Sequence, residues 1–207
     1  MFSKATQVKN LDKIPAFGTL DDSPRGRVLR AAAHLFRVQG YAGTTVREIA
    51  ALVGIQSGSL FHHFRSKEEI LFVVMREIIV YNTVVLQEVV EGITDPRTKL
   101  RAVIQAELNA INGITRDAMT VLVFEWGSVS REHKEQLESL RQEYEEIWIK
   151  ALAGSGLEET MAGSPSVRRS LLRGAIAWTA TWYRRDGSIS IEGLADIVLG
   201  MALGGAV

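Results

Sequence analysis

The amino-acid sequence predicts an all-α protein. Apolar residues recur at three- and four-residue spacing along most of the chain. Several of these segments begin with Ser, Thr or Asp followed by Pro, or by Glu three positions later, and several end at Gly. No segment alternates strictly between apolar and polar residues, and no Asn-Gly or Asp-Gly turn joins two β-branched runs. These three observations predict helices throughout and no sheet.

The N-terminal part contains an arm and a first helix. Residues 1–23 include scattered lysines and show no sustained periodicity, so we expect a flexible arm over 1–23. Ser23 and Pro24 start the first helix, because serine caps an N-terminus and proline fits the first turn. Gly40 ends that helix.

Two short helices follow. Thr45 caps the first of them, with Glu48 at the position that completes a capping box. Gly54 interrupts this helix, and a second short helix is predicted over residues 57–64.

Longer helices occupy the rest of the chain, over residues 66–207. Ser66 starts one that continues through Val90, before Gly92, again with a capping-box pattern. The remaining helices are predicted over residues 96–112, 116–127, 131–152, 165–186 and 190–203.

The composition excludes several classes of protein. The chain has 207 residues, of which 46% are hydrophobic, enough for the core of one large domain or two small ones. No cysteine and only four scattered histidines argue against disulfides, thiolate chemistry and a metal centre, and no cofactor is expected. No apolar run reaches about 18 residues and no signal-peptide core begins the chain. We therefore expect a soluble, cytoplasmic protein that does not enter a membrane.

The charge is distributed unevenly along the chain. The net charge is zero, from 24 basic and 24 acidic residues, yet residues 1–70 carry ten Lys and Arg against six Asp and Glu. Residues 71–207 carry fourteen Lys and Arg against eighteen Asp and Glu. The net charge is therefore +4 for residues 1–70 and −4 for residues 71–207. This asymmetry predicts that only the N-terminal part contacts a polyanion. The C-terminal part has no nucleophile, base and acid in a recognisable arrangement and no glycine-rich phosphate loop, so we expect no enzyme.

Residues 44–64 combine two short helices with a tight glycine turn. Helices of about seven residues are not stable alone, so they need the helix over 24–39 as a packing partner. Three helices in this arrangement form a helix-turn-helix, whose second helix enters the major groove of DNA. Leu60 and Phe64, four residues apart, point into the core of the trio. The sequence therefore predicts a DNA-binding domain over residues 24–65.

The segment GYAGTTVREIAALVGIQSGSLFHHFRSKEEIL resembles the DNA-binding region of TetR-family bacterial repressors. The family pattern is a Thr-capped helix with Ile-Ala, a Gly turn, a Gly-x-Leu-Tyr-x-His-Phe helix and a Lys shortly afterwards. The departure is Phe61, where the family has tyrosine, so a phenolic hydroxyl that could contact phosphate is lost. With the preceding helix, the resemblance covers about 55 residues and implies an N-terminal DNA-binding domain followed by a helical ligand-binding and dimerisation domain.

The resemblance implies roles for the residues at matching positions. Thr45 would hold a phosphate through its hydroxyl or backbone N–H, and Arg47 would reach a base edge such as guanine O6 and N7. His63 would contact backbone phosphate, and Lys67 would add charge at a helix N-terminus that already favours phosphate. The complete set of DNA-contacting candidates is Thr45, Arg47, Ser57, Gly58, Ser59, Phe61, His62, His63 and Lys67.

Aromatic and basic residues stand out in the second domain. Tryptophans with few phenylalanine partners suit a roomy pocket between helices, and arginines at the start of the penultimate helix could bind the phosphates of a ligand. The alternatives are core packing for the aromatic residues and a surface or interface position for the arginines. The ligand-binding candidates are Phe124, Trp126, Trp148, Arg169, Arg173, Trp178 and Trp182.

The last two predicted helices are expected to form a dimer interface. Both are strongly apolar and are joined by a short turn, which would leave a large exposed patch on a monomer. Pairing with the same two helices of a second chain forms a four-helix interface. TetR-type proteins, which this chain resembles, form homodimers in this way.

The C-terminal run TWYRRDGSIS, followed by LADIVLGMALGG, is similar to a TetR branch that includes repressors of steroid and lipid catabolism genes. Members of that branch respond to CoA thioesters, so the resemblance implies an acyl-CoA effector. We predict a homodimeric repressor that a small-molecule effector releases from a palindromic operator in double-stranded DNA. The alternatives are a multidrug or other hydrophobic-ligand sensor of the same family, and a helical acyl-CoA or lipid carrier without a role on DNA.

Overall fold

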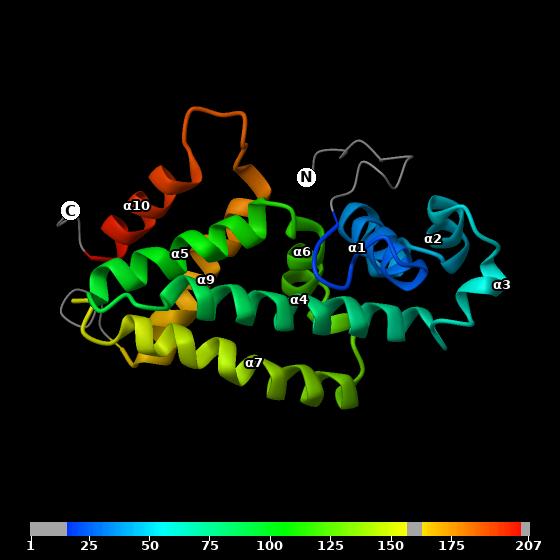
Figure 1. Ribbon diagram of the computed structural model, residues 1–207, viewed down its shortest axis with the longest axis horizontal. Coiled ribbons are helices and arrows are strands. Elements are labelled where there is room, and N and C mark those ends of the chain that lie inside the picture. Colours follow the sequence, from blue (N-terminus) through cyan, green and yellow to red (C-terminus); the bar gives the residue numbers. More distant parts are fainter. Residues whose placement is uncertain (1–15, 157–162, 204–207) are drawn as a thin grey trace. The chain divides into compact units, whose positions relative to one another are not determined.

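The structure, a computed structural model, describes residues 16–156 and 163–203 (Figure 1). The regular elements in these ranges are helices, and no strand is present among them. The all-α prediction is therefore confirmed. The first fifteen residues of the expected arm lie outside the described residues.

The helices, in chain order, are α1 (Pro24–Gly43), α2 (Val46–Val53), α3 (Ser57–Leu60), α4 (Lys67–Val90), α5 (Pro96–Asn112), α6 (Arg116–Phe124), the short 3₁₀ helix η2 (Trp126–Ser128), α7 (Arg131–Leu152), α9 (Pro165–Trp182) and α10 (Ile191–Ala202). No helix in the described part of the chain is both long and apolar enough to span a bilayer.

Polar side chains start the helices at the predicted positions. Ser23 Oγ accepts a hydrogen bond from the Gly26 N–H at 3.0 Å at the start of α1. At α2 the capping box is complete, because Thr45 Oγ1 accepts from the Glu48 N–H while Glu48 Oε2 accepts from the Thr45 N–H. The same kind of contact starts α5, α9 and α10, from Asp95, Ser164 and Ser190.

Three helices end earlier than predicted. Helix α3 stops at Leu60 and continues as a turn, and α6 stops at Phe124. Helix α9 stops at Trp182, four residues before the predicted end, because Tyr183 has extended backbone with ψ of 137°. The Tyr183 hydroxyl donates to the Ile189 carbonyl at 3.0 Å, which stabilises the loop before α10.

The described residues divide into two compact units. The first unit contains residues 16–81 and 114–140, and the second contains the described parts of 82–113 and 141–207. This division differs from the boundary predicted after residue 65, because α6 packs against α1 within the first unit.

Helix α1 is the centre of the first unit. Its apolar face is buried against α2 and α6, with Leu29 and Phe36 almost inaccessible to solvent. Residues 16–23, predicted as the end of a flexible arm, are instead held by two apolar side chains: Leu20 is fully buried, and the Phe17 ring lies edge-on to Tyr81 at 5.3 Å. Two apolar side chains are enough to hold this segment against the first unit, and two residues are too few to produce the sustained periodicity whose absence suggested an arm.

A buried polar cluster links α1 to α6. His34 is 2% exposed, and its Nδ1 lies 2.8 Å from Asp117 Oδ2. Arg37 forms an ion pair with the other oxygen of the same carboxylate. Burial raises the pKa of Asp117, but the hydrogen bond with His34 and the charge of Arg37 outweigh it, so the pKa lies below its ordinary value.

Substitution Asp117→Asn should therefore destabilise the protein in a pH-dependent way. At pH 7 we expect a loss of about 1.5–3 kcal/mol, because two hydrogen bonds to a charged acceptor are weakened. A depressed carboxyl pKa adds stability above the unfolded pKa of about 3.9, and that stability is lost as pH falls through the folded pKa. The difference between parent and variant in urea unfolding should thus shrink below about pH 4. A difference that stays constant down to pH 3 would contradict this account.

The second unit has its own core. Helix α5 packs against α9 and α10 (Figure 1), with Leu108, Ile176 and Leu194 buried at these contacts. Asn112 Nδ2 donates to Thr179 Oγ1 at 2.9 Å, which satisfies a buried amide between α5 and α9. Two short helices in the first unit and a buried polar cluster in the second carry the candidate functions.

Candidate nucleic-acid interface

A glycine sets the angle between α2 and α3. Gly54 has φ of +79° and ψ of 31°, the left-handed conformation that costs other residues about 1–2 kcal/mol. Its N–H donates to the Ala51 carbonyl, and the Ile55 N–H donates to the Ala50 carbonyl. The chain therefore turns within three residues and starts α3 at Ser57.

Helix α3 and the turn after it have one buried and one exposed side. Leu60 is fully buried and Phe64 is 1% exposed, which confirms that both point into the core of the trio. The opposite side carries small or polar side chains, apart from the Phe61 ring. Its exposed residues are Gly58, Ser59, Phe61, His62 and His63, with Ser57 half-buried beside them.

Phe61 and Arg47 are the large exposed groups of this surface. The Phe61 side chain is 54% exposed. Arg47 is exposed on α2 and has no ion-pair partner among the described residues. A free guanidinium next to a short polar helix can donate two parallel hydrogen bonds to a planar acceptor pair.

Thr45 is already engaged in its own helix cap. Its N–H and its hydroxyl both donate to Glu48 Oε2, each at 2.7 Å. The hydrogen bonds from the Thr45 side chain and backbone lower the pKa of Glu48, so this carboxyl is ionised at neutral pH. The phosphate contact expected of Thr45 would require Glu48 to give up both bonds, because the two groups assigned to phosphate are occupied.

Lys67 is also engaged within the first unit. Its Nζ donates to the carbonyls of Tyr41 and Thr44 at 2.8 and 2.7 Å and lies 4.3 Å from the Tyr41 ring centroid. An ammonium group has three donors, so two of the three are used here. In the structure Lys67 thus binds backbone carbonyls at the end of α1. The resemblance implied instead a cation free to bind phosphate.

The sequence-based set omitted two basic residues at the start of α1. Arg25 lies with its guanidinium 5.0 Å over the Phe64 ring, and Arg27 Nη2 donates to the Val53 carbonyl at the end of α2. The first turn of α1 contains no acidic residue. Cations are unfavourable at a helix N-terminus, so this pattern is a sequence signal for an external anion at that position.

A cavity lies between the start of α1 and α3. Arg27, Ser59 and His63 line it together with the residues Asp22, Pro24, Val53 and Ile55. It brings the predicted contact residues Ser59 and His63 next to Arg27, so the polar surface extends from α3 to the start of α1.

The ligand candidates of the second unit surround a buried arginine. Arg169 on α9 is 3% exposed, and its guanidinium lies 4.0 Å over the fully buried Trp148 ring of α7. Its Nη2 lies 3.1 Å from Glu107 Oε2 on α5, and its Nε donates to Glu145 Oε2 at 3.0 Å. The charge of Arg169 is therefore compensated by two carboxylates, and it is not a free cation waiting for a phosphate.

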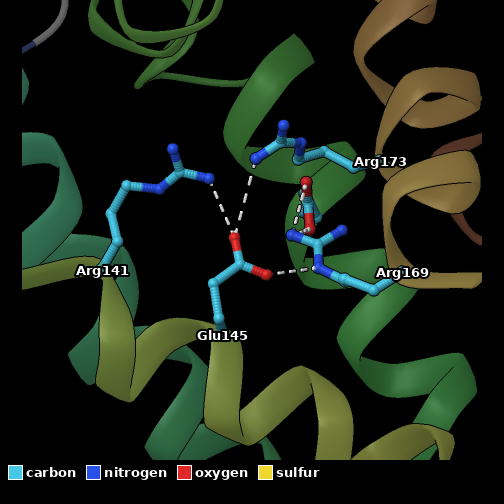
Figure 2. Close-up of polar contacts among 5 residues, drawn as sticks. Arg141, Glu145, Arg169 and Arg173 are labelled. Atoms are coloured by element: carbon cyan, nitrogen blue, oxygen red, sulfur yellow. Dashed lines mark hydrogen bonds and ion pairs between the residues drawn. The ribbon is translucent and has the colours of Figure 1, made fainter. Parts of the chain in front are cut away.

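Glu145 lies at the centre of this cluster. Figure 2 shows its carboxylate between Arg141 on α7 and the two arginines of α9. Arg141 Nη2 donates to Glu145 Oε1 at 2.9 Å, and Arg173 Nη1 lies 3.8 Å from the same oxygen. Burial raises the pKa of Glu145, but the charges of Arg169 and Arg141 outweigh it and the pKa is lowered.

Two tryptophans lie outside this cluster. Trp178 is 62% exposed and Trp182 is 51% exposed, so neither lines an internal pocket of the second unit. Leu171, Trp178 and Trp182 share one exposed side of α9, because Trp178 is seven residues after Leu171 and Trp182 is four residues after Trp178. Their role in ligand binding stays a prediction, and in the single chain their rings are on the outer face of the helix.

The other two aromatic candidates belong to the first unit. Phe124 ends α6 and is 46% exposed, whereas Trp126 is half-buried in η2. Both therefore belong to a different compact unit from Trp148, Arg169 and Arg173.

Comparison with known proteins places this chain in a family. Residues 28–74 match the family described as bacterial regulatory proteins, tetR family, and residues 94–206 match the tetracyclin repressor-like C-terminal domain. The protein belongs to the TetR family. Together the two matches include both the helix-turn-helix surface and the arginine cluster.

Individual relatives and solved structures resemble this chain over most of its length. The TetR-family chain is 32% identical over 185 residues to the HTH-type transcriptional repressor KstR2 of Rhodococcus jostii strain RHA1. This alignment covers 87% of the present chain and 90% of the relative. The structure of the ketosteroid transcriptional regulator KstR2 of Mycobacterium tuberculosis aligns with a TM-score of 0.76 at 26% identity, over 91% and 97% of the two chains. The superantigen PfiT aligns with a TM-score of 0.69 at 44% identity, over 87% and 96%. The chain is thus a TetR-family DNA-binding repressor and not an enzyme.

Proposed function

We propose that this TetR-family repressor is a cytoplasmic homodimer that binds a palindromic operator and releases it when an acyl-CoA or related CoA thioester binds. The observation that carries the DNA-binding part is the two-sided helix α3, with Leu60 and Phe64 buried and a polar surface exposed. A helix of this kind presents its exposed residues to base edges in the major groove. The effector class rests on the similarity to KstR2, a ketosteroid transcriptional regulator, and on the resemblance of the C-terminal run to a TetR branch that responds to CoA thioesters.

Contacts to the operator divide into two kinds. Arg47, with its free guanidinium, is the candidate for a base edge, and Ser57, Ser59 and Phe61 face the groove beside it. His62 and His63, with Arg27 at the cavity edge, are candidates for phosphate contacts. Thr45 and Lys67 stabilise this surface through contacts within the chain. Thr45 caps α2, and Lys67 donates to a carbonyl at the end of α1.

Substitution Arg47→Ala tests the base contact. We expect operator binding to weaken by about 1–3 kcal/mol and the preference at one base pair of each half-site to relax. Fluorescence anisotropy with a duplex selected by the protein, and with single-base variants of that duplex, measures both effects. Arg131→Ala, an exposed arginine on α7, is the matched control. Equal weakening on every duplex would reduce Arg47 to a phosphate contact.

The dimer part rests on the outer face of α9 and α10. This face exposes large apolar side chains from both helices, namely Val167, Leu171, Trp178, Trp182, Ile197 and Met201. Such a patch is unusual on a monomer and suits a self-complementary pairing around a two-fold axis. Two chains paired in this way would present two copies of α3 to DNA.

Release of the operator tests the effector class. Ligand binding changes operator affinity only if the ligand prefers one arrangement of the two DNA-binding heads over the other. An acyl-CoA should lower the anisotropy of a labelled operator complex, whereas the free fatty acid and CoA alone should not. Release by the free fatty acid at the same concentration would indicate a general hydrophobic-ligand sensor instead.

A further inference from the structure

Phe61 is an apolar ring within the polar surface of the helix-turn-helix. It follows α3 directly and is more than half exposed, whereas its neighbour Leu60 is fully buried. The exposed side chains of Ser59, His62 and His63 around it can each form hydrogen bonds. A phenyl ring has no donor and no acceptor, so Phe61 offers no hydrogen bond to a phosphate or to a polar base edge. Only an apolar group on the partner gains free energy by covering it.

The backbone places Phe61 on the same side as Gly58. Phe61 continues the helical turn with φ of −70° and ψ of −9°, and its N–H donates to the Gly58 carbonyl at 3.2 Å. Residues three positions apart on a helix are neighbours on its surface. The ring and the glycine therefore share the exposed side of α3 and of the turn after it.

Gly58 leaves an open space beside the ring. A Cβ at this position would meet no heavy atom of the described residues within 4 Å, apart from its own helical turn and chain neighbours. The φ angle of Gly58 is also outside the left-handed range, so the backbone conformation is open to other residues. Glycine destabilises a helix relative to alanine. Because neither packing nor backbone requires it here, the missing side chain is best explained by close approach of an external surface.

The major groove offers one apolar group to such a ring. Its base edges carry hydrogen-bond donors and acceptors, and thymine alone adds a C5-methyl group. We propose that Phe61 reads a thymine in each half-site through this methyl group, with Gly58 allowing the close approach that the contact needs. The inference rests on the proposed function and deepens it, because it names the base that this position of the protein selects.

This contact would specify sequence without a hydrogen bond. Removal of one methyl group from water changes an affinity by about fourfold. Contacts to phosphate release counterions and steepen the dependence of binding on salt, whereas a methyl contact releases none. The preference for thymine should therefore be independent of salt concentration.

Replacement of thymine by deoxyuridine tests the proposal, because it deletes the methyl group and keeps the base pair. The probe is a duplex that the protein selects from a random library, and each thymine position is replaced in turn in fluorescence anisotropy titrations. For the parent we expect a position at which replacement weakens binding about fourfold per half-site. Phe61→Ala should bind the thymine and deoxyuridine duplexes equally. Leu140→Ala, which changes an exposed apolar residue of α7, should behave like the parent.

Gly58→Ala tests the close approach. Alanine favours a helix, so the melting temperature should not fall, yet the added methyl group separates the backbone of α3 from the groove. We expect binding to the thymine duplex to weaken at least fourfold and the effect of deoxyuridine to disappear. Binding as tight as that of the parent would overturn the close approach on which the thymine contact depends.

A deoxyuridine-sensitive position that becomes insensitive in a folded Phe61→Ala supports the contact. The absence of a sensitive position in the parent overturns it, as does equal sensitivity in Phe61→Ala. A shallower slope of log affinity against log salt concentration in Phe61→Ala also overturns it, because that result identifies a lost phosphate contact. In each of these cases the parent still binds its operator, so the proposed function stands. Failure of the parent to select any duplex would overturn the proposed function and the thymine contact together.

Discussion

Substitution Trp178→Glu is expected to convert the proposed dimer into monomers. Trp178 is the most exposed of the large apolar residues on α9 and α10, at 62%, and it lies in the middle of the exposed face between Leu171 and Trp182. Buried tryptophans near the centre of an interface contribute about 2 kcal/mol or more each, and a two-fold axis removes two of them at once. The dimer should therefore dissociate about 1,000-fold more readily.

Sedimentation equilibrium measures this effect directly. Ile114→Glu is the matched control, because Ile114 is 50% exposed but does not belong to α9 or α10. Operator affinity should fall together with the dimer, since a monomer places only one copy of α3 on the DNA. If Trp178→Glu remains a dimer at micromolar concentration, the face formed by α9 and α10 is not the interface.

Arg169→Leu is expected to have the largest effect on folding stability. The guanidinium is the shared partner of Glu107 and Glu145, and its removal leaves the carboxylate of Glu107 buried without a cation. Breaking a buried ion pair from one side costs about 3–5 kcal/mol. For a domain of this size the melting temperature should fall by roughly 10 °C or more.

The double variant Glu107→Leu with Arg169→Leu distinguishes charge from shape. Replacement of both members of a buried pair by apolar residues is often neutral or stabilising, so most of the lost stability should return. Calorimetric melting of the single and double variants provides the comparison. If the double variant melts no higher than Arg169→Leu, the loss is due to the packing of Arg169 on Trp148 and Tyr144 rather than to an unpaired charge.

Local features of the sequence predicted most of the fold. Ser23, Thr45, Asp95 and Ser164 each cap the helix that follows them, because capping depends only on residues within one turn. The buried side of the helix-turn-helix was likewise visible in the four-residue spacing of Leu60 and Phe64. Helix ends were less predictable, because contacts such as that of the Tyr183 hydroxyl with the Ile189 carbonyl decide them.

The partners of charged side chains could not be predicted in the same way. Arg169 pairs with Glu145, 24 residues away, and with Glu107, 62 residues away, and no local pattern connects these positions. Lys67 donates to the carbonyls at the end of α1, which lie 23 and 26 residues earlier. Residues that the family pattern marks as phosphate contacts are therefore partly occupied by the protein itself. The exposure of Trp178 and Trp182 was equally hidden, since periodicity does not say which apolar face of a helix is covered.

The central claim is that α3 lies in the major groove twice per dimer. Dimethyl sulfate footprinting tests it, because the reagent methylates guanine N7, which lies in the major groove. On a duplex that the protein selects from a random library, we expect two protected guanine clusters related by a dyad, with centres one helical turn or a whole number of turns apart, one turn being roughly 34–36 Å. A single protected cluster, or tight binding that leaves every guanine N7 reactive, would contradict the account.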